Sequence, residues 1–114
     1  MFFNTHAEEL RWYQTGDFSD CFLRVYKHKA DKFLIRLTKP NTKNPLHCVD
    51  LYSPEEVIAY CTKVCILQPH MYVDLRVDRG YPETDFRKIF AGLAPRIRET
   101  RWTYKKKPRQ ARFR

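Results

Sequence analysis

The segment that begins at Ser53 constrains the fold of this chain more than any other part of the sequence. Ser53 is a helix-capping residue, Pro54 stands at the first helical position, and Glu55 and Glu56 suit the positive end of a helix dipole. Apolar residues then recur at helical spacing and predict a buried face formed by Val57, Ile58, Cys61, Val64 and Cys65. A helix with one apolar face needs an apolar layer to pack on, so we expect a layered fold.

Alternating side chains predict that this second layer is a β-sheet. Residues 20–38 alternate with period two on both sides of a short polar link at 28–31, which predicts a β-hairpin. A proline-containing loop at 39–45 leads to a third strand at 46–52. A fourth strand at 71–77 follows the helix, and this connection is compatible with a right-handed crossover between parallel strands.

Two further helices complete the predicted body. One runs from the capping residue Thr5 to about Tyr13, and a short one covers residues 84–93. The order α-β-β-β-α-β-α predicts a small two-layer α+β domain with about four strands and helices packed on the sheet. We expect a compact body at residues 1–94 and an extended basic C-terminal tail at residues 95–114.

Most of the positive charge lies in that C-terminal extension. The chain has 22 Lys plus Arg and 13 Asp plus Glu, which gives a formal net charge of +9. Residues 95–114 contain nine basic residues and one acid, Glu99, and therefore carry +8. Residues 1–94 contain 13 basic and 12 acidic residues and carry +1. The sequence therefore indicates a near-neutral folded body followed by a cationic segment.

Aromatic residues are interleaved with the basic ones in the extension, and this favours RNA binding. Basic side chains neutralise phosphates, and aromatic rings stack on unpaired bases. The predicted RNA-binding residues are Arg96, Arg98, Arg101, Trp102, Tyr104, Lys105, Lys106, Lys107, Arg109, Arg112, Phe113 and Arg114. Two alternatives stay open. Residues 105–109 fit a nuclear-import signal, and a basic tail also suits an acidic protein surface or anionic lipid.

A second set of aromatic and arginine residues is predicted on the sheet. If Cys21, Leu23 and Val25 are buried, strand alternation places a mixed set on the opposite face. Its members are Phe22, Arg24, Tyr26, Leu34, Arg36, Tyr72 and Arg76. Such a face could stack bases as RNA-recognition sheets do, although the element order differs from that module. We expect instead that the first helix or a partner protein covers this face.

The cysteines and histidines give little support for a metal or catalytic site. Cys61 and Cys65 share a helix face, and His47, Cys48 and His70 could add ligands, but the spacing is not that of structural zinc. We expect the two helix cysteines to be reduced core residues. A Cys48–His70 nucleophile pair stays open because such partners meet in space, yet no catalytic motif supports it. We predict no cofactor, no metal and no enzymatic activity.

Other patterns exclude several classes of protein. No run approaches the roughly 18 apolar residues of a membrane span, and the N-terminus lacks the basic start and apolar stretch of a secretory signal. No glycine-rich nucleotide-binding loop is present, and no small-molecule substrate is evident. We expect a mitochondrial or other intracellular protein that is not secreted; the import signal would make it nuclear.

The extension resembles in its composition the basic, aromatic-containing extensions of small ribosomal and ribonucleoprotein subunits. No family motif is recognised beyond this composition. The resemblance implies a non-catalytic structural subunit of a ribosomal or mitoribosomal type of assembly, with its tail on ribosomal RNA and its body against neighbouring proteins. The alternative is an accessory subunit of a mitochondrial respiratory or other large protein complex, with the tail on an acidic protein or lipid surface.

Overall fold

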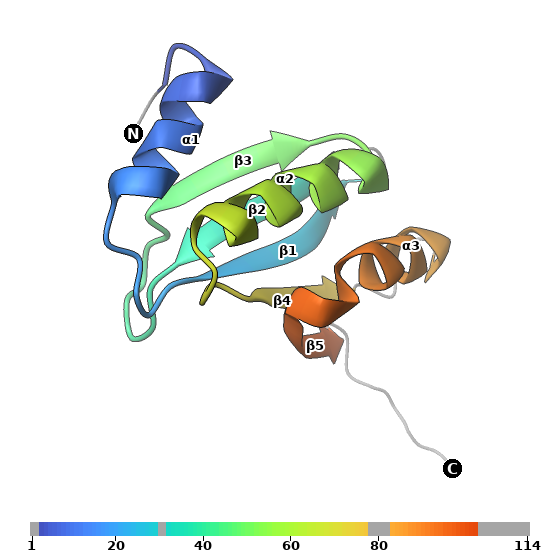
Figure 1. Cartoon of the computed structure of the whole chain (residues 1–114). Helices are drawn as coiled ribbons and strands as arrows, with labels where there is room; N and C mark the ends of the chain where they lie inside the picture. The colour runs from blue at the N-terminus through green and yellow to red at the C-terminus, as the bar shows by residue number, and fades with distance from the viewer. Residues whose placement is uncertain (1–2, 30–31, 78–82, 103–114) are drawn as a thin grey trace.

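The computed structural model describes residues 3–29, 32–77 and 83–102 of the chain (Figure 1). The elements are α1 (His6–Thr15), β1 (Phe22–Lys29), β2 (Lys32–Thr38), β3 (His47–Leu51), α2 (Pro54–Leu67), β4 (Val73–Val77), α3 (Glu83–Leu93), the 3-10 helix η1 (Ala94–Arg96) and β5 (Ile97–Trp102). The predicted order α-β-β-β-α-β-α is confirmed up to Leu93. Among the described helices, none combines the length and hydrophobicity of a membrane span.

One mixed sheet contains all five strands, in the order β3-β2-β1-β4-β5. The pairs β1–β2 and β2–β3 are antiparallel, whereas β1–β4 and β4–β5 are parallel. The strand β5 was not predicted, and it lies inside residues 95–114, the range assigned to the extension. Residues 97–102 therefore belong to the sheet of the body, because β5 pairs with β4 along its length.

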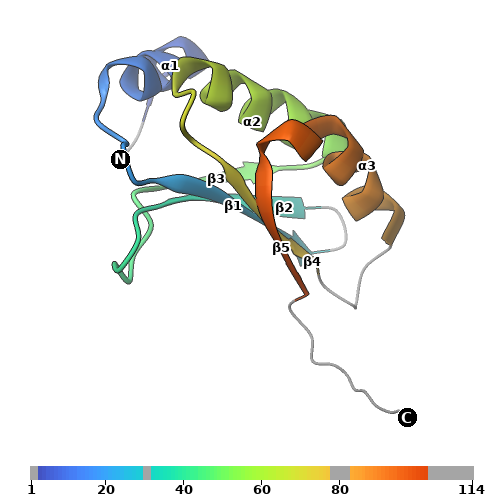
Figure 2. The same cartoon turned by 60° about the horizontal axis from the view of Figure 1, so that its bottom comes forward.

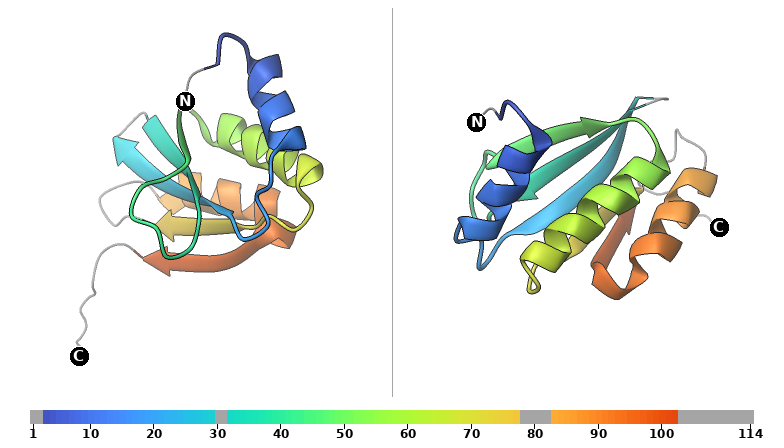
Figure 3. Two further views of the ribbon diagram at one scale, coloured as in Figure 1. Left: turned by 90° about the vertical axis from the view of Figure 1, so that its left-hand side faces the viewer. Right: turned by 45° about the horizontal axis from the view of Figure 1, so that its top comes forward.

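The three helices lie on the same face of the sheet, and the opposite face is not covered by any of them (Figures 2 and 3). The prediction that the first helix covers the aromatic and arginine face is wrong. α1 packs beside α2 instead. A buried hydrogen bond of 2.7 Å joins the Tyr13 hydroxyl on α1 to the Tyr60 hydroxyl on α2. Within the described residues, the fold is thus a two-layer structure with its helices on one side of the sheet.

Strand alternation and helix capping explain why this side is buried. In β2 the odd-numbered residues are buried and the even-numbered ones half-buried, so one face of this strand packs against the helices. The backbone amide of Glu56 donates to Ser53 Oγ at 3.1 Å, which starts α2 where the sequence predicts. Cys61 and Cys65 on α2 are fully buried core residues, in agreement with the expectation from their spacing.

A buried carboxylate connects α1 to the other elements on the helical side. Glu9 of α1 is 9% exposed and accepts hydrogen bonds from the Tyr60 hydroxyl and from His47 Nε2, each at 2.8 Å. Its second oxygen lies 3.0 Å from His6 Nδ1. Burial alone would raise the pKa of Glu9, but the hydrogen bonds from His47, Tyr60 and His6 outweigh it and lower the pKa below 4.5.

We predict that Glu9→Ala lowers the free energy of unfolding by about 1–3 kcal/mol, because it leaves buried partners without an acceptor. Chemical denaturation at pH 7 measures this change. Glu83→Ala is the control, since Glu83 forms an exposed pair with Arg87 and should change stability by less than about 0.5 kcal/mol. Equal effects of the two substitutions would contradict the assigned role of Glu9.

The same carboxylate gives a pH dependence. Because its pKa is lowered in the folded protein, Glu9 stabilises the fold above the ordinary glutamate pKa of 4.5. This contribution is lost as the pH falls through the lowered value. We therefore expect the stability difference between wild type and Glu9→Ala to shrink under acidic conditions, and denaturation curves recorded between pH 7 and pH 3 test this expectation.

Candidate nucleic-acid interface

The uncovered side of the sheet carries the aromatic and arginine residues that strand alternation places there. We call this surface the open face; its residues are Phe22, Arg24, Tyr26, Leu34, Arg36, Tyr72, Asp74 and Arg76. Leu23 and Val25 point to the helices and are fully buried, whereas Arg24 and Tyr26 are half-buried. The layer of helices leaves this face open to a partner (Figure 2).

A stacked aromatic pair forms the base of the open face. The rings of Phe22 on β1 and Tyr72 before β4 are nearly parallel, with an interplanar angle of 11° and centroids 5.2 Å apart. The guanidinium carbon of Arg24 lies 5.0 Å from the centroid of the Phe22 ring. Phe22 is therefore covered and only 7% exposed, and it supports Tyr72 and Arg24 above it.

A single buried acid positions two of the three arginines. Asp74, the second residue of β4, is fully buried, and its Oδ2 accepts from Arg24 Nε at 3.0 Å and from Arg76 Nε at 3.2 Å. The two arginine side chains are 27% and 21% exposed, so part of each guanidinium reaches solvent. Sequence analysis did not single out this role of Asp74, which depends on the pairing of β1 with β4.

The third arginine faces the first across the β1–β2 pair. Arg24 and Arg36 are direct cross-strand partners. Like charges in opposed positions destabilise a sheet unless an anion lies nearby, and the carboxylate of Asp74 pairs with Arg24 and Arg76 but not with Arg36. Arg36 is held over the Tyr26 ring, with its guanidinium carbon 5.0 Å from the ring centroid. The eight residues named as the open face thus sum to a formal charge of +2, and they present planar cations beside aromatic rings.

The structure places four of the predicted RNA-binding residues in or beside the sheet. Arg96 ends η1, and its Nη1 donates to the Pro69 carbonyl at 3.3 Å, so this residue also has a structural role. Arg98, Arg101 and Trp102 belong to β5, where Arg101 pairs with the open-face residue Arg76. The remaining predicted residues lie outside the described residues: Tyr104, Lys105, Lys106, Lys107, Arg109, Arg112, Phe113 and Arg114.

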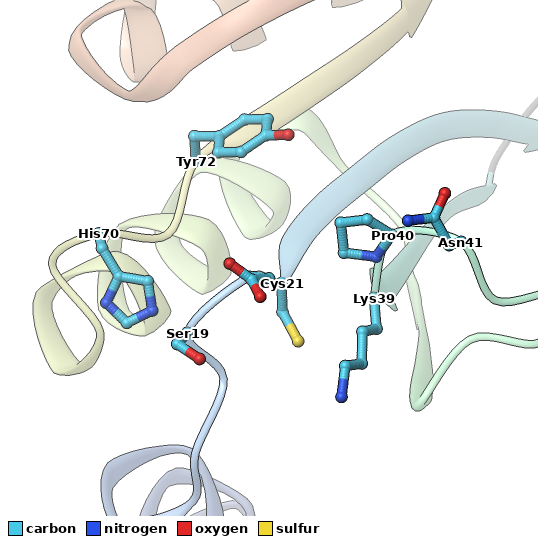
Figure 4. Close-up of a pocket in the computed structure, with 8 residues that line it drawn as sticks. Ser19, Cys21, Lys39, Pro40, Asn41, His70 and Tyr72 are labelled. Atoms are coloured by element: carbon cyan, nitrogen blue, oxygen red, sulfur yellow. The ribbon is translucent and has the colours of Figure 1, made fainter.

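A cavity of about 700 Å³ adjoins the open face at the beginning of β1 (Figure 4). Three segments that are distant in sequence form it: the approach to β1, the loop after β2 and the approach to β4. Its polar lining includes Ser19, Asp20, Lys39, Asn41 and His70. Tyr72 lines it as well and connects it to the open face. Sequence analysis recognised these segments as turns and loops but could not bring them together.

The described residues give no geometric support for nucleophilic catalysis. Cys48 and His70 line different cavities, one beside α1 and the other at the start of β1. The Cys21 thiol is 3% exposed, and burial raises its pKa despite the nearby Lys39, so the thiol stays protonated at neutral pH. Within the described ranges, no three His, Cys, Asp or Glu side chains are grouped so that they could hold a metal ion.

Comparison of the chain with protein-family models, with curated protein sequences and with solved structures finds no match.

We predict that Asp74→Asn lowers the free energy of unfolding by about 1–3 kcal/mol, because two charge-assisted hydrogen bonds lose their anion. Urea denaturation measures the change. Asp50→Asn is the matched control, since Asp50 is 44% exposed and pairs with Lys32 at the outer strand; it should cost less than about 1 kcal/mol. If the two substitutions lower the free energy of unfolding equally, the role assigned to Asp74 in holding Arg24 and Arg76 is wrong.

Proposed function

We propose that the protein is a non-catalytic structural subunit of a large ribonucleoprotein assembly of ribosomal or mitoribosomal type, and that it binds RNA through the open face and the basic C-terminal segment. The observation that carries this proposal is the opposition of Arg24 and Arg36 on a sheet face that none of the described helices covers, where the one buried acid, Asp74, pairs with Arg24 and Arg76. Binding of a polyanion to such a face is electrostatically favourable, because the anion neutralises the opposed arginines.

The aromatic content of the open face favours RNA over a purely charged partner. Sheet faces that recognise single-stranded RNA stack bases on aromatic rings and on guanidinium planes. Tyr26 beside Arg36, and Tyr72 stacked on Phe22, offer both kinds of plane on neighbouring strands. Double-helical RNA is recognised mainly by shape and backbone contacts, so we expect unpaired nucleotides to be the preferred partner.

The position of β5 connects the two proposed RNA-binding parts. β5 runs parallel to β4 and ends at Trp102, which pairs with Val77 at the end of β4. The sequence that follows contains six basic residues and no acid between 103 and 114. Because β5 is hydrogen-bonded to β4, which carries Arg76, we propose that one RNA strand contacts both the open face and this basic segment.

An accessory role in a protein complex is the second candidate. On the helical side Ile66 of α2 is 60% exposed and Phe90 of α3 is 47% exposed, and exposed apolar side chains of this size suit protein contacts. In the ribonucleoprotein proposal these residues face neighbouring proteins of the assembly. Co-purification that survives nuclease treatment would favour the protein complex, whereas nuclease-sensitive association would favour the ribonucleoprotein.

We predict that the full chain binds a structured RNA with single-stranded regions, with an affinity that falls as salt rises. Removing residues 103–114 leaves every described element intact and takes away six basic residues. The slope of log affinity against log salt should decrease by up to about four, from about 0.7 per phosphate contact on a single strand. Filter binding or fluorescence anisotropy across a salt series measures the slope.

Substitution of the open face should weaken the same interaction by a separate route. Arg36→Gln removes one phosphate contact and is expected to lower the salt slope by about 0.7, the value for one contact on a single strand. Lys63→Gln removes the same charge from the exposed surface of α2 and serves as the matched control. If Arg36→Gln and Lys63→Gln bind RNA identically to the wild type, the open face is not the interface.

A further inference from the structure

We propose that the cavity at the start of β1 (Figure 4) binds a single unpaired nucleotide, with Lys39 at its phosphate and the lining residues Asp20 and Asn41 at the edge of its base. This inference rests on the proposed RNA-binding function and assigns a specific site for one nucleotide beside the open face.

The position of the cavity supports this assignment. Tyr72 lines the cavity and also stacks on Phe22, which belongs to the open face. An RNA strand that follows the open face along β1 and β4 therefore reaches the cavity without leaving the protein surface. Its volume of about 700 Å³ lies within the range typical of sites for small ligands.

The lining has the chemical groups that a nucleotide requires. Lys39 supplies a cation for phosphate, the Asp20 carboxylate accepts hydrogen bonds, and the Asn41 amide both donates and accepts them. Tyr72 adds an aromatic ring at the side that adjoins the open face. A carboxylate next to a lysine would not suit a bare phosphate, but it suits a base whose edge carries N–H donors.

Backbone and side-chain hydrogen bonds hold the walls of the cavity in place. Asn41 has a φ of 67°, the left-handed conformation that asparagine tolerates better than most residues. The Thr42 hydroxyl donates to the Lys39 carbonyl at 2.6 Å and fixes the same turn. On the opposite wall, His70 Nε2 lies 2.9 Å from the Phe18 carbonyl, so this nitrogen carries a proton. A preformed cavity reduces the entropic cost of binding.

The cavity suits binding and not catalysis. Cys21 lines the cavity and is buried. Burial raises the pKa of its thiol, so the thiol remains uncharged and is a poor nucleophile at neutral pH. The histidine of the cavity already donates one ring proton to a backbone carbonyl. We therefore expect the nucleotide to bind and dissociate without undergoing a chemical reaction.

The test compares two RNA hairpins that differ by one bulged nucleotide, each with the full-length protein. Wild type should bind the bulged hairpin about three- to tenfold more tightly than the fully paired one, since a few hydrogen bonds to the base are gained. Asn41→Gly keeps the left-handed backbone but removes the amide, and it should reduce this preference to the part that the open face contributes, while leaving affinity for the paired hairpin unchanged. Lys39→Gln should reduce affinity for the bulged hairpin.

Asn44→Gly is the matched control, because Asn44 is an exposed residue of the same loop that is not among the residues lining the cavity. If Asn41→Gly and Lys39→Gln keep the wild-type preference for the bulge, the cavity assignment is overturned while salt-dependent RNA binding still stands. If the full chain binds neither hairpin, the proposed function itself fails.

Titration with the four nucleoside monophosphates distinguishes an RNA nucleotide from a free one. Calorimetry should show no more than weak binding if the cavity serves a nucleotide within RNA, because the open-face contacts are then missing. Tight binding of a free mononucleotide that Asn41→Gly removes, without any RNA binding, would uphold the cavity as a nucleotide site and overturn the ribonucleoprotein function.

Discussion

The burial of alternate strand residues under helices on one side only is the constraint on which the other features of this structure depend. Leu23 and Val25 of β1 and Leu75 of β4 are buried against the helical layer. The intervening residues must then face the opposite side, where none of the described helices lies (Figure 2). Because parallel β4 is hydrogen-bonded to β1, residues fifty positions apart, Arg24 and Asp74, meet on that side.

The electrostatics of the open face follow from this arrangement. A fully buried carboxylate needs paired charges. Asp74 obtains them from Arg24 on the neighbouring strand β1 and from Arg76 on its own strand β4. Its negative charge is then used by Arg24 and Arg76, and Arg36 remains beside Tyr26 with Arg24 directly opposite. The ion pairs of Asp74 therefore order the Arg24 and Arg76 guanidinium groups, although one carboxylate cannot neutralise both. Ordered, partly exposed guanidinium groups beside aromatic rings are suited to phosphate and base together.

The sequence allowed a correct prediction of the elements that have strong local signals. The cap at Ser53 and the alternation in β1, β2 and β4 lead directly to α2 and to the two faces of the sheet. β5 was missed because half of its residues are charged and they follow Pro95 closely, so they resemble the basic tail more than a strand. The face of the sheet on which α1 packs was also mispredicted, since it depends on the contacts of Glu9 with His47 and Tyr60. The cavity could not be predicted because its walls come from three separate loops.

The most direct test of this account is an NMR titration of the full-length protein with an RNA hairpin that contains unpaired nucleotides. The account predicts that the Nε–H signals of Arg24, Arg36 and Arg76 and the ring signals of Tyr26 shift on RNA addition. The Nε–H signal of Arg87, on the exposed surface of α3, should remain in place. Shifts confined to the helical side, or an open face that does not respond to RNA, would contradict the assignment of the open face as the RNA interface.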